Sequence, residues 1–393
     1  MDVKDAIAGT IAGARDRLTG LSHRLHAHPE TAWTEERAAA WVSAELADGG
    51  FDVQAGVCEL PTAFIARAGT GPLNIGICAE YDALPAVGHA CGHNIIAASS
   101  VGAGLALAAV ADDLGLTVTV LGTPAEEGGG GKVYMLERGA FDGVHAAMMV
   151  HPGPVDVAEA RPFAVSHMLV RFRGQATHAA AYPEQGINAA DAFTVAQVAI
   201  GLLRQQLLPS TRVHGVVTHA GDAPNVIPDQ TEGRWYVRAE SLDELAGLEP
   251  KIRRCFEAGA LATGCELEIE AEAPPYAEFR NDPSLLPLYR ANAERLGREF
   301  LPADDSDGAA GLAGRMNRAS TDMGNVSLVV PAIHPYIGIG SLPAVNHQKE
   351  FAAHCVTQAA DRALTDGATA LAWTAADAAL DTGLRARLVD GEA

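Results

Sequence analysis

The chain has 393 residues, of which 48% are hydrophobic and 20% charged, a composition typical of a globular protein that is too long for one hydrophobic core. Its formal net charge of −21 disfavours a nucleic-acid partner, because few side chains could neutralise phosphates. No apolar run reaches the roughly 20 residues that span a bilayer, so no membrane partner is expected. The absence of a signal-peptide pattern and of any C-x-x-C among the cysteines predicts a cytoplasmic protein with free thiols.

The first 162 residues alternate helix-like and strand-like segments. Residues 36–50 ("ERAAAWVSAELADGG") have helical spacing and end on a Gly pair. Apolar runs at 73–85, 117–127 and 145–153 are typical of buried strands, and 94–115 of a buried helix. Buried strands that alternate with helices predict an α/β domain, in which a mixed, mostly parallel sheet is flanked by helices.

The pattern changes at about Phe163. Strand-like segments with polar alternation and two amphipathic helices follow, in the order strand, helix, strand, strand, helix, strand. We therefore expect a four-stranded α+β lid over residues 163–281. Residues 1–162 and 282–393 would then form one discontinuous catalytic domain.

Polar residues follow the predicted strands directly. Glu80 and Asp82 come after the first strand, Glu126 and Glu127 after the second, and His151 after the third. Ligand sites in open α/β sheets lie at the carboxyl ends of strands. We therefore expect these side chains to share one cleft.

The stretch "GHACGHNIIAASS" (residues 88–100) contains a thiol and imidazoles before a helix-like run. Cys91 and His93, separated by Gly92, suit ligation to one metal or to adjacent metals. Two other interpretations stay open. In one, the stretch is a turn with a buried cysteine in which Asn94 caps the next helix. In the other, Cys91 is a nucleophile that His89 or His93 activates.

The Glu126–Glu127 pair is unusual at a strand end, since neighbouring carboxylates raise a pKa unless a cation neutralises them. In a metal hydrolase, one carboxylate can bind metal while the other takes a proton from water. A phosphate-binding loop is excluded, because that motif needs Gly at position 126 and Ser or Thr at the position of Val133. A solvated acidic turn is the remaining alternative.

Together with His151 and His347, the residues Cys91, His93 and Glu127 make a set of potential ligands. The set is too large for one catalytic zinc with an open position and suits two bridged metals. The single thiolate favours zinc, and the carboxylate and imidazoles also admit manganese or cobalt.

Six stretches occur in an order that resembles a known family: "AEYDALPAVGHACGHN", "GTPAEEGGGGK", "MMVHPG", "GQATHAAAYPEQGINAADA", "GDAPNVIPD" and "NHQKEF". Over residues from about 20 to 355 the chain resembles the aminoacylase/carboxypeptidase-type metallopeptidases of family M20, subfamily D. The resemblance implies a zinc-exopeptidase-like fold with an inserted lid and dimerisation domain, and a homodimer. It also implies hydrolysis of the amide bond of an N-acyl amino acid, an aminobenzoyl-glutamate-like conjugate or a dipeptide.

The resemblance also assigns roles to residues of the metal site. Glu126 matches the general base, and Asp82 matches a carboxylate that orients a metal-site neighbour. The matched metal ligands are Cys91, His93, Glu127, His151 and His347.

Three residues of the expected lid match substrate-site positions. His178 matches a histidine thought to stabilise the tetrahedral oxyanion, often from the partner subunit of a dimer. Asn225 matches an asparagine near the substrate carboxylate or the dimer face, and Arg234 is expected beside it.

Departures from the family pattern favour the branch of aminobenzoyl-glutamate hydrolases and dipeptidases. Asn94 stands where many relatives have Asp, Glu80 opens a Glu-Tyr-Asp in place of Asp-Met-Asp, and "ASTDMGNVS" (residues 319–327) replaces Gly-Ser-Glu-Asp-Phe. The rival functions are a non-catalytic conjugate-binding protein and a cysteine-nucleophile amidase.

Overall fold

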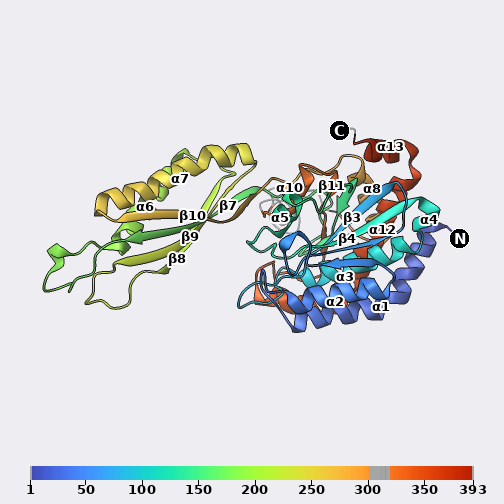
Figure 1. Cartoon of the computed structure of the whole chain (residues 1–393), viewed down its shortest axis with the longest axis horizontal. Coiled ribbons are helices and arrows are strands. Elements are labelled where there is room, and N and C mark those ends of the chain that lie inside the picture. Colours follow the sequence, from blue (N-terminus) through green and yellow to red (C-terminus); the bar gives the residue numbers. More distant parts are fainter. Residues whose placement is uncertain (1, 301–310, 312–314, 316–318, 392–393) are drawn as a thin grey trace. The chain divides into compact units, whose positions relative to one another are not determined.

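The computed structural model describes residues 2–300, 311, 315 and 319–391, and the chain forms two compact units (Figure 1). The first unit comprises residues 1–162 and 279–393, and the second comprises Phe163–Glu278. The two ends of the inserted segment are neighbours, because the N–H of Phe279 donates to the carbonyl of Pro162 at 3.0 Å.

The first unit contains a six-stranded sheet of order β1-β2-β4-β3-β5-β11. β3 pairs in parallel with β4 and β5, and β5 pairs in parallel with β11, whereas β2 is antiparallel to both β1 and β4. The predicted mixed, mostly parallel sheet is thus confirmed. The strands are β1 (Asp52–Ala55), β2 (Phe64–Ala68), β3 (Leu73–Ala79), β4 (Leu116–Gly122), β5 (Ala146–Met148) and β11 (Ala332–Ile333), and β6 (His151–Gly153) pairs with β12 (Tyr336–Gly338).

Helices cover both faces of this sheet. Alternate residues of each strand point to opposite faces, so each strand contributes side chains to both layers of helices. Ile75 and Ile77 of β3 belong to one buried cluster with residues of α1, α3 and α12, whereas Cys78 belongs to another with residues of α5 and α10. Figure 1 shows α1, α2 and α3 beneath β3 and β4. The helices are α1 (Val3–Ala27), α2 (Glu36–Asp48), α3 (His93–Ala108), α4 (Ala111–Leu114), α5 (Gly131–Glu137), α8 (Leu285–Arg295), α10 (Met323–Ser327), α11 (Lys349–His354), α12 (Gln358–Leu380) and α13 (Thr382–Asp390).

Small residues let α3 lie between two other helices. A Cβ added to Gly102 would lie 2.9 Å from Leu18 of α1 and 3.1 Å from Ala368 of α12. The Ala, Gly and Ser content of α3 therefore permits close packing on both sides, and this packing holds the start of α3 in place.

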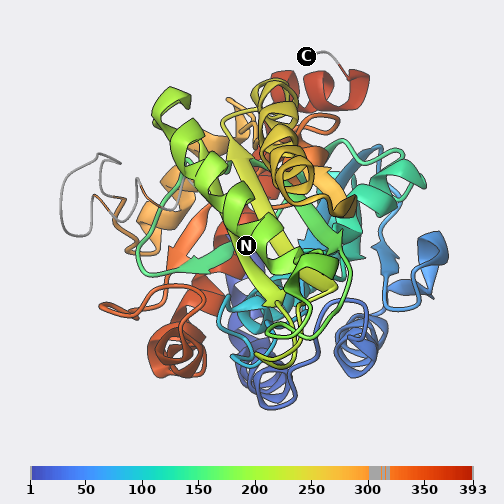
Figure 2. The ribbon, with the colours of Figure 1, turned by 90° about the vertical axis from the view of Figure 1, so that its left-hand side faces the viewer.

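The second unit is a four-stranded antiparallel sheet of order β10-β7-β9-β8. Its helices α6 and α7 lie side by side (Figure 2) and bury one face of the sheet, with Trp235 and Val237 of β9 in the core. Arg234 and Arg238 alternate with these residues and lie on the opposite face. The elements follow the expected order: β7 (Ala164–Arg173), α6 (Ala189–Leu203), β8 (Arg212–His219), β9 (Gln230–Ala239), α7 (Leu242–Thr263) and β10 (Glu266–Tyr276).

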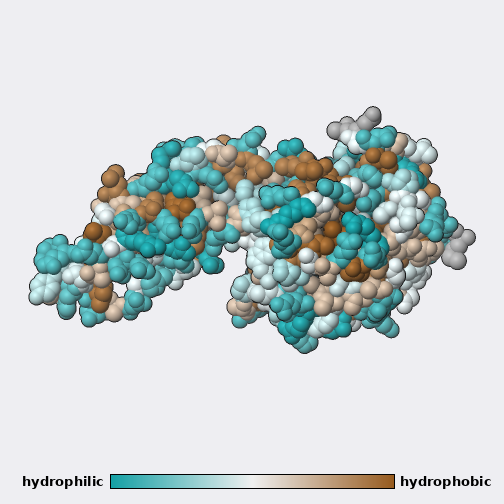
Figure 3. Space-filling model, in the orientation of Figure 1, coloured by the Kyte–Doolittle hydropathy of each residue, from teal (hydrophilic) through white to brown (hydrophobic). Residues whose placement is uncertain are grey.

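None of the helices in the described part of the chain is both long enough and apolar enough to cross a membrane. On the face drawn in Figure 3, hydrophilic side chains cover much of the surface of each unit.

A buried lysine joins three elements at one end of the larger sheet. Lys132 of α5 is fully buried, and its Nζ lies 2.5 Å from Glu80 after β3 and 2.6 Å from Asp322 before α10. The Lys132 N–H also donates to Asp322 at 2.9 Å. One ammonium group thus lies between two buried carboxylates and reduces the repulsion between them.

Replacing this lysine is expected to destabilise the fold strongly. Lys132→Met keeps the length of the side chain and leaves Glu80 and Asp322 buried without a counter-charge, which costs about 3–5 kcal/mol. Arg290→Met is the control, since it removes the exposed Arg290–Glu294 pair, whose contribution is about 1 kcal/mol or less. Urea unfolding measures both changes, and equal stabilities would contradict the assigned role of Lys132.

Candidate metal centre

The structure brings the residues predicted for the metal site together in the first unit. They reach it from the ends of β3 and β4, the start of α3, the start of β6 and the loop before α11. The carboxyl ends of parallel strands share one edge of a sheet, so segments far apart in sequence meet there. The residues are Asp82, Cys91, His93, Glu126, Glu127, His151 and His347.

Potential ligand atoms form groups that overlap at Cys91. Cys91, His93 and His151 each offer a ligand atom within 4.8 Å of the others, and Cys91, Glu127 and His347 do the same. The Sγ of Cys91 lies 3.6 Å from the Nε2 atoms of both His151 and His347. The sulfur of Cys91 is therefore a potential ligand in two neighbouring groups.

A third group, Glu80, His93 and Glu126, adjoins the first through His93. The Nε2 of His93 lies 3.5 Å from Glu80 and 3.9 Å from Glu126. The pair of glutamates predicted to divide ligation and proton transfer therefore both face the same imidazole, since Glu127 lies 4.0 Å from that Nε2.

Hydrogen bonds on the outer ring nitrogens orient two of the histidines. The Nδ1 of His93 pairs with Asp82 at 3.0 Å, and the Nδ1 of His151 donates to the Pro152 carbonyl at 2.8 Å. Each bond leaves Nε2 directed at the ligand groups. Burial, aided by the nearby histidines His334 and His93, lowers the pKa of His151 to about 3, so its imidazole is neutral and can bind a metal.

The carboxyl groups of the site lie close together, and bound cations would reduce the repulsion between them. Burial, followed by the charges of Glu80 and Glu127, raises the pKa of Glu126 well above its ordinary value. The buried atoms Glu80 Oε2, His93 Nε2 and Glu127 Oε1 make no hydrogen bond to any described residue. Carboxylate, imidazole and thiol groups of this kind fit divalent cations of the zinc or manganese type.

The environment of Cys91 disfavours a free nucleophilic thiolate. Burial, followed by the negative charge of Glu127, raises the pKa of the Cys91 thiol well above its ordinary value. Nucleophilic cysteines need the opposite shift. A bound cation would instead deprotonate the thiol and use it as a ligand.

The alternative interpretation in which Asn94 caps the following helix is wrong. The helix α3 begins at His93, and its N-cap is Gly92, which has φ +84°. Asn94 is buried, and its Nδ2 donates to Ser22 at 2.8 Å and to the carbonyl of Cys355 at 3.2 Å. Asn94 therefore fastens the start of α3 to α1 and to the residue after α11.

Sequence patterns assigned no role to Lys132, Asp322 or Glu35. Their partners lie far away along the chain: Lys132 pairs with Asp322 across 190 positions, and Glu35 accepts from Ala125 across 90 positions. No local spacing reveals such contacts. The only hint is the variant stretch at residues 319–327, which contains Asp322.

The residues predicted for substrate contact lie in the second unit. His178 is exposed and lies next to Asn225, because Ala179 N–H donates to the Asn225 carbonyl at 3.0 Å. Arg234 lies on the open face of β9, where its Nε contacts Glu272 at 2.9 Å. Its guanidinium thus already has a carboxylate partner.

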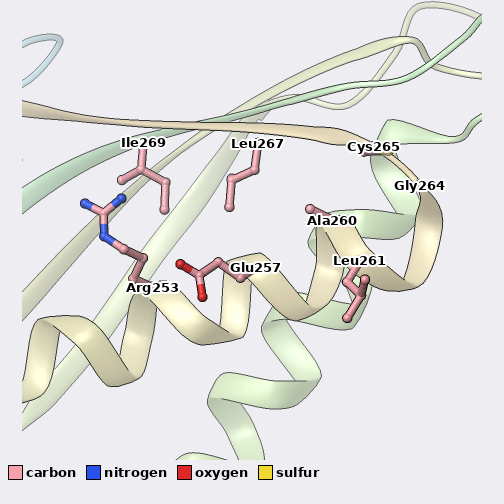
Figure 4. Close-up of a pocket in the computed structure, with 8 residues that line it drawn as sticks. All are labelled: Arg253, Glu257, Ala260, Leu261, Gly264, Cys265, Leu267 and Ile269. Carbon is pink, nitrogen blue, oxygen red and sulfur yellow. The ribbon is translucent and has the colours of Figure 1, made fainter.

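A cavity of about 610 Å³ in the second unit contains none of the predicted site residues. Figure 4 shows Arg253 and Glu257 of α7 opposite Leu267 and Ile269 of β10. Without a cluster of ligands or an acid–base pair, these side chains support no catalytic assignment.

Loss of the Asp82 carboxylate is expected to weaken metal binding. Asp82 holds both His93 Nδ1 and the Glu127 N–H, the latter at 2.9 Å, so Asp82→Asn should lower metal affinity about 10–100-fold. Titration calorimetry with Zn²⁺ or Mn²⁺ measures the change. Asp361→Asn, at the surface pair with His23, is the matched control. Equal affinities for both variants would contradict the role of Asp82.

Comparison with known proteins gives one family. The sequence pattern of Peptidase family M20/M25/M40 matches residues 77–348. The chain is 41% identical to the Xaa-Arg dipeptidase of Mus musculus over 390 residues, which covers 95% of this chain and 88% of that protein. It is 32% identical to one of the subunits of the p-aminobenzoyl-glutamate hydrolase of Escherichia coli K12, over 67% of this chain and 59% of that protein.

Solved structures share the fold. A Bacillus subtilis protein described as a dinuclear metal binding peptidase from the M20 family has a TM-score of 0.66 and 23% identity, covering 93% of this chain and 98% of that chain. An aminobenzoyl-glutamate utilization protein from Klebsiella pneumoniae has a TM-score of 0.67 and 20% identity, with coverages of 90% and 96%. The chain therefore belongs to peptidase family M20/M25/M40 and is a metallopeptidase/amidohydrolase.

Proposed function

We propose that this protein is a dinuclear-metal amidohydrolase of dipeptides, N-acyl amino acids or aminobenzoyl-glutamate-like conjugates. The observation that carries the proposal is the pair of ligand groups that share Cys91 and adjoin Glu126. The relatives named as a Xaa-Arg dipeptidase and an aminobenzoyl-glutamate hydrolase support this substrate class. Dipeptides with a C-terminal basic residue are the first substrates to test.

Each proposed cation has its own ligands apart from the shared thiolate. Cys91, His93 and His151 would hold one, and Cys91, Glu127 and His347 the other. Zn²⁺ or Mn²⁺ fits these donors, and Co²⁺ is also compatible. When bound, such ions polarise the scissile carbonyl and lower the pKa of water.

Glu126 is assigned the proton transfers. Its carboxylate faces His93 from the same strand-end loop that supplies Glu127. It takes a proton from the attacking water and passes it to the leaving amine. Asp82 keeps the proton on Nδ1 of His93, so that Nε2 stays available.

The second unit, together with the residues up to 281, is assigned as a lid that also mediates a homodimer. The Nδ1 of His178 accepts N–H groups of Ala180 and Ala181, each at 3.2 Å, so its Nε2–H is the donor that can face an oxyanion. Asn225, adjacent to it, would contact the substrate carboxylate. Arg234 would have to break its ion pair with Glu272 before it could contact the substrate.

Two alternatives predict different behaviour in solution. A conjugate-binding protein on the same scaffold would bind these substrates without turnover. A cysteine-nucleophile amidase would keep its activity in chelators and lose it on alkylation of Cys91.

Metal removal and the loss of the base should have separable effects. Chelation should abolish amide hydrolysis, and added Zn²⁺ or Mn²⁺ should restore it. Glu126→Gln should lower kcat by about 10²–10⁴-fold while both metals remain bound, because only the proton transfer is lost. Released amine and metal content are measured, with the exposed Glu159→Gln as the control. Full turnover by Glu126→Gln, or activity that is insensitive to chelators, contradicts the mechanism.

A mixing experiment tests whether His178 acts from the partner subunit. His178→Ala should lower kcat by about 10²–10³-fold with bound metals retained. Mixed dimers of His178→Ala and Glu126→Gln subunits should regain activity, since one site then has both residues. Mixtures that stay as inactive as the separate variants show that His178 does not act across a dimer.

A further inference from the structure

Glu35 is a buried carboxylate whose contacts reach the loop of the glutamate pair. It lies just before α2 and has no exposed surface. Its Oε1 accepts the N–H of Ala125 at 2.8 Å and the N–H of Trp33 at 3.0 Å. Its Oε2 accepts the hydroxyl of Thr62 at 3.0 Å. Both carboxylate oxygens are therefore occupied by fixed donors.

Both residues held by Oε1 have left-handed backbone conformations. Trp33 has φ +69° and Ala125 has φ +57°. Residues with a Cβ disfavour this region, and such strain persists where surrounding contacts enforce it, often at functional sites. Here one oxygen atom enforces it at two positions that are far apart in sequence.

Ala125 anchors the loop that carries Glu126 and Glu127. Its carbonyl accepts the N–H of Gly129 at 3.1 Å, and a Cβ on Gly129 would lie 2.6 Å from the Cβ of Ala125. The loop thus folds tightly back over Ala125. Its other attachment is the Glu127 N–H on Asp82. Two buried carboxylates therefore hold the loop on either side of Glu126.

Trp33 lies against the outer side of the same loop. A Cβ on Gly129 would lie 2.9 Å from the Cε2 of Trp33, and the Trp33 ring lies 5.9 Å from that of Tyr134 in α5. Glu35 thus fixes the loop from within through Ala125. It also fixes the backbone of Trp33, whose aromatic side chain covers the same loop.

We propose that Glu35 is a positioning residue that holds Ala125 in its left-handed conformation, so that Glu126 and Glu127 project into the metal-ligand groups. The role rests on the proposed function of this site. Among the described residues, Glu35 accepts hydrogen bonds from Trp33, Thr62 and Ala125, none of which is a proposed metal ligand, so it acts through the backbone of the loop.

Two substitutions of similar shape distinguish the role of Glu35 as a hydrogen-bond acceptor from the role of the space that its side chain fills. Burial, followed by the charge of Asp82, raises the pKa of Glu35 to about 7, so the neutral amide of Glu35→Gln is a conservative change that keeps the acceptor. Glu35→Met fills the same space and accepts no hydrogen bond. We expect Glu35→Gln to retain activity and Glu35→Met to lower kcat on the order of 100-fold, with KM unchanged.

Metal binding gives a readout that is independent of turnover. Among the groups formed by described residues, Glu127 belongs to the one with Cys91 and His347 and not to the one of Cys91, His93 and His151. Titration of Glu35→Met with Zn²⁺ should therefore show one weakened site and one unchanged site. A purely structural effect of Glu35 would weaken both sites alike.

Rescue at Ala125 tests the mechanism directly. Glycine adopts the left-handed region without a Cβ penalty, so Ala125→Gly in the Glu35→Met background should restore kcat about tenfold. If Glu35→Met does not fold, Glu35→Asp replaces it, because Asp keeps the charge and is too short to reach both N–H groups. Rescue by Ala125→Gly is expected there too.

Two results would overturn the proposal: wild-type kcat with two intact metal sites in Glu35→Met, or no recovery with Ala125→Gly. Failure of the proposed function looks different. In that case the wild-type protein itself would show no metal-dependent hydrolysis, and the titration of the two Zn²⁺ sites would still report whether Glu35 positions Glu127.

Discussion

Carboxylates gathered at one edge of a sheet, away from water, repel each other unless positive charge lies among them. Glu80, Asp82 and Glu126 meet this condition at the ends of β3 and β4, and the half-buried Glu127 lies beside them. Lys132 provides one positive charge between Glu80 and Asp322. The ligand groups that share Cys91 are where we propose divalent cations, so the same electrostatic requirement would apply to the core and to the site.

The parts that sequence patterns predicted are those set by local chemistry. Buried strands followed from apolar runs, and the polar residues directly after them were expected close together, as the ligand groups of the structure have them. The order of short motifs then indicated the family. Within each strand or motif the informative residues lie within a few positions of each other, so local patterns predict the elements, and the resemblance of the ordered motifs indicates the family.

The parts that were missed depend on contacts between distant segments. One interpretation left open was that the Asn94 side chain caps a helix, because Asn often does so, yet tertiary packing directs it to Ser22 and Cys355. Glu35 looks like any glutamate at the start of an amphipathic helix until the fold brings Ala125 to it. A side chain's partners across the fold cannot be inferred from its own neighbourhood in the chain.

The insertion of the second unit has a consequence for biosynthesis. Translation completes residues 163–278 before it makes α12, the helix that packs against α1 and α3 in the core of the first unit. Residues 1–162 therefore leave the ribosome with their apolar faces incompletely covered, while the antiparallel sheet of the second unit is still being synthesised. Late closure of this kind raises the contact order of the first unit, slows its folding and lengthens its exposure to aggregation and to chaperones.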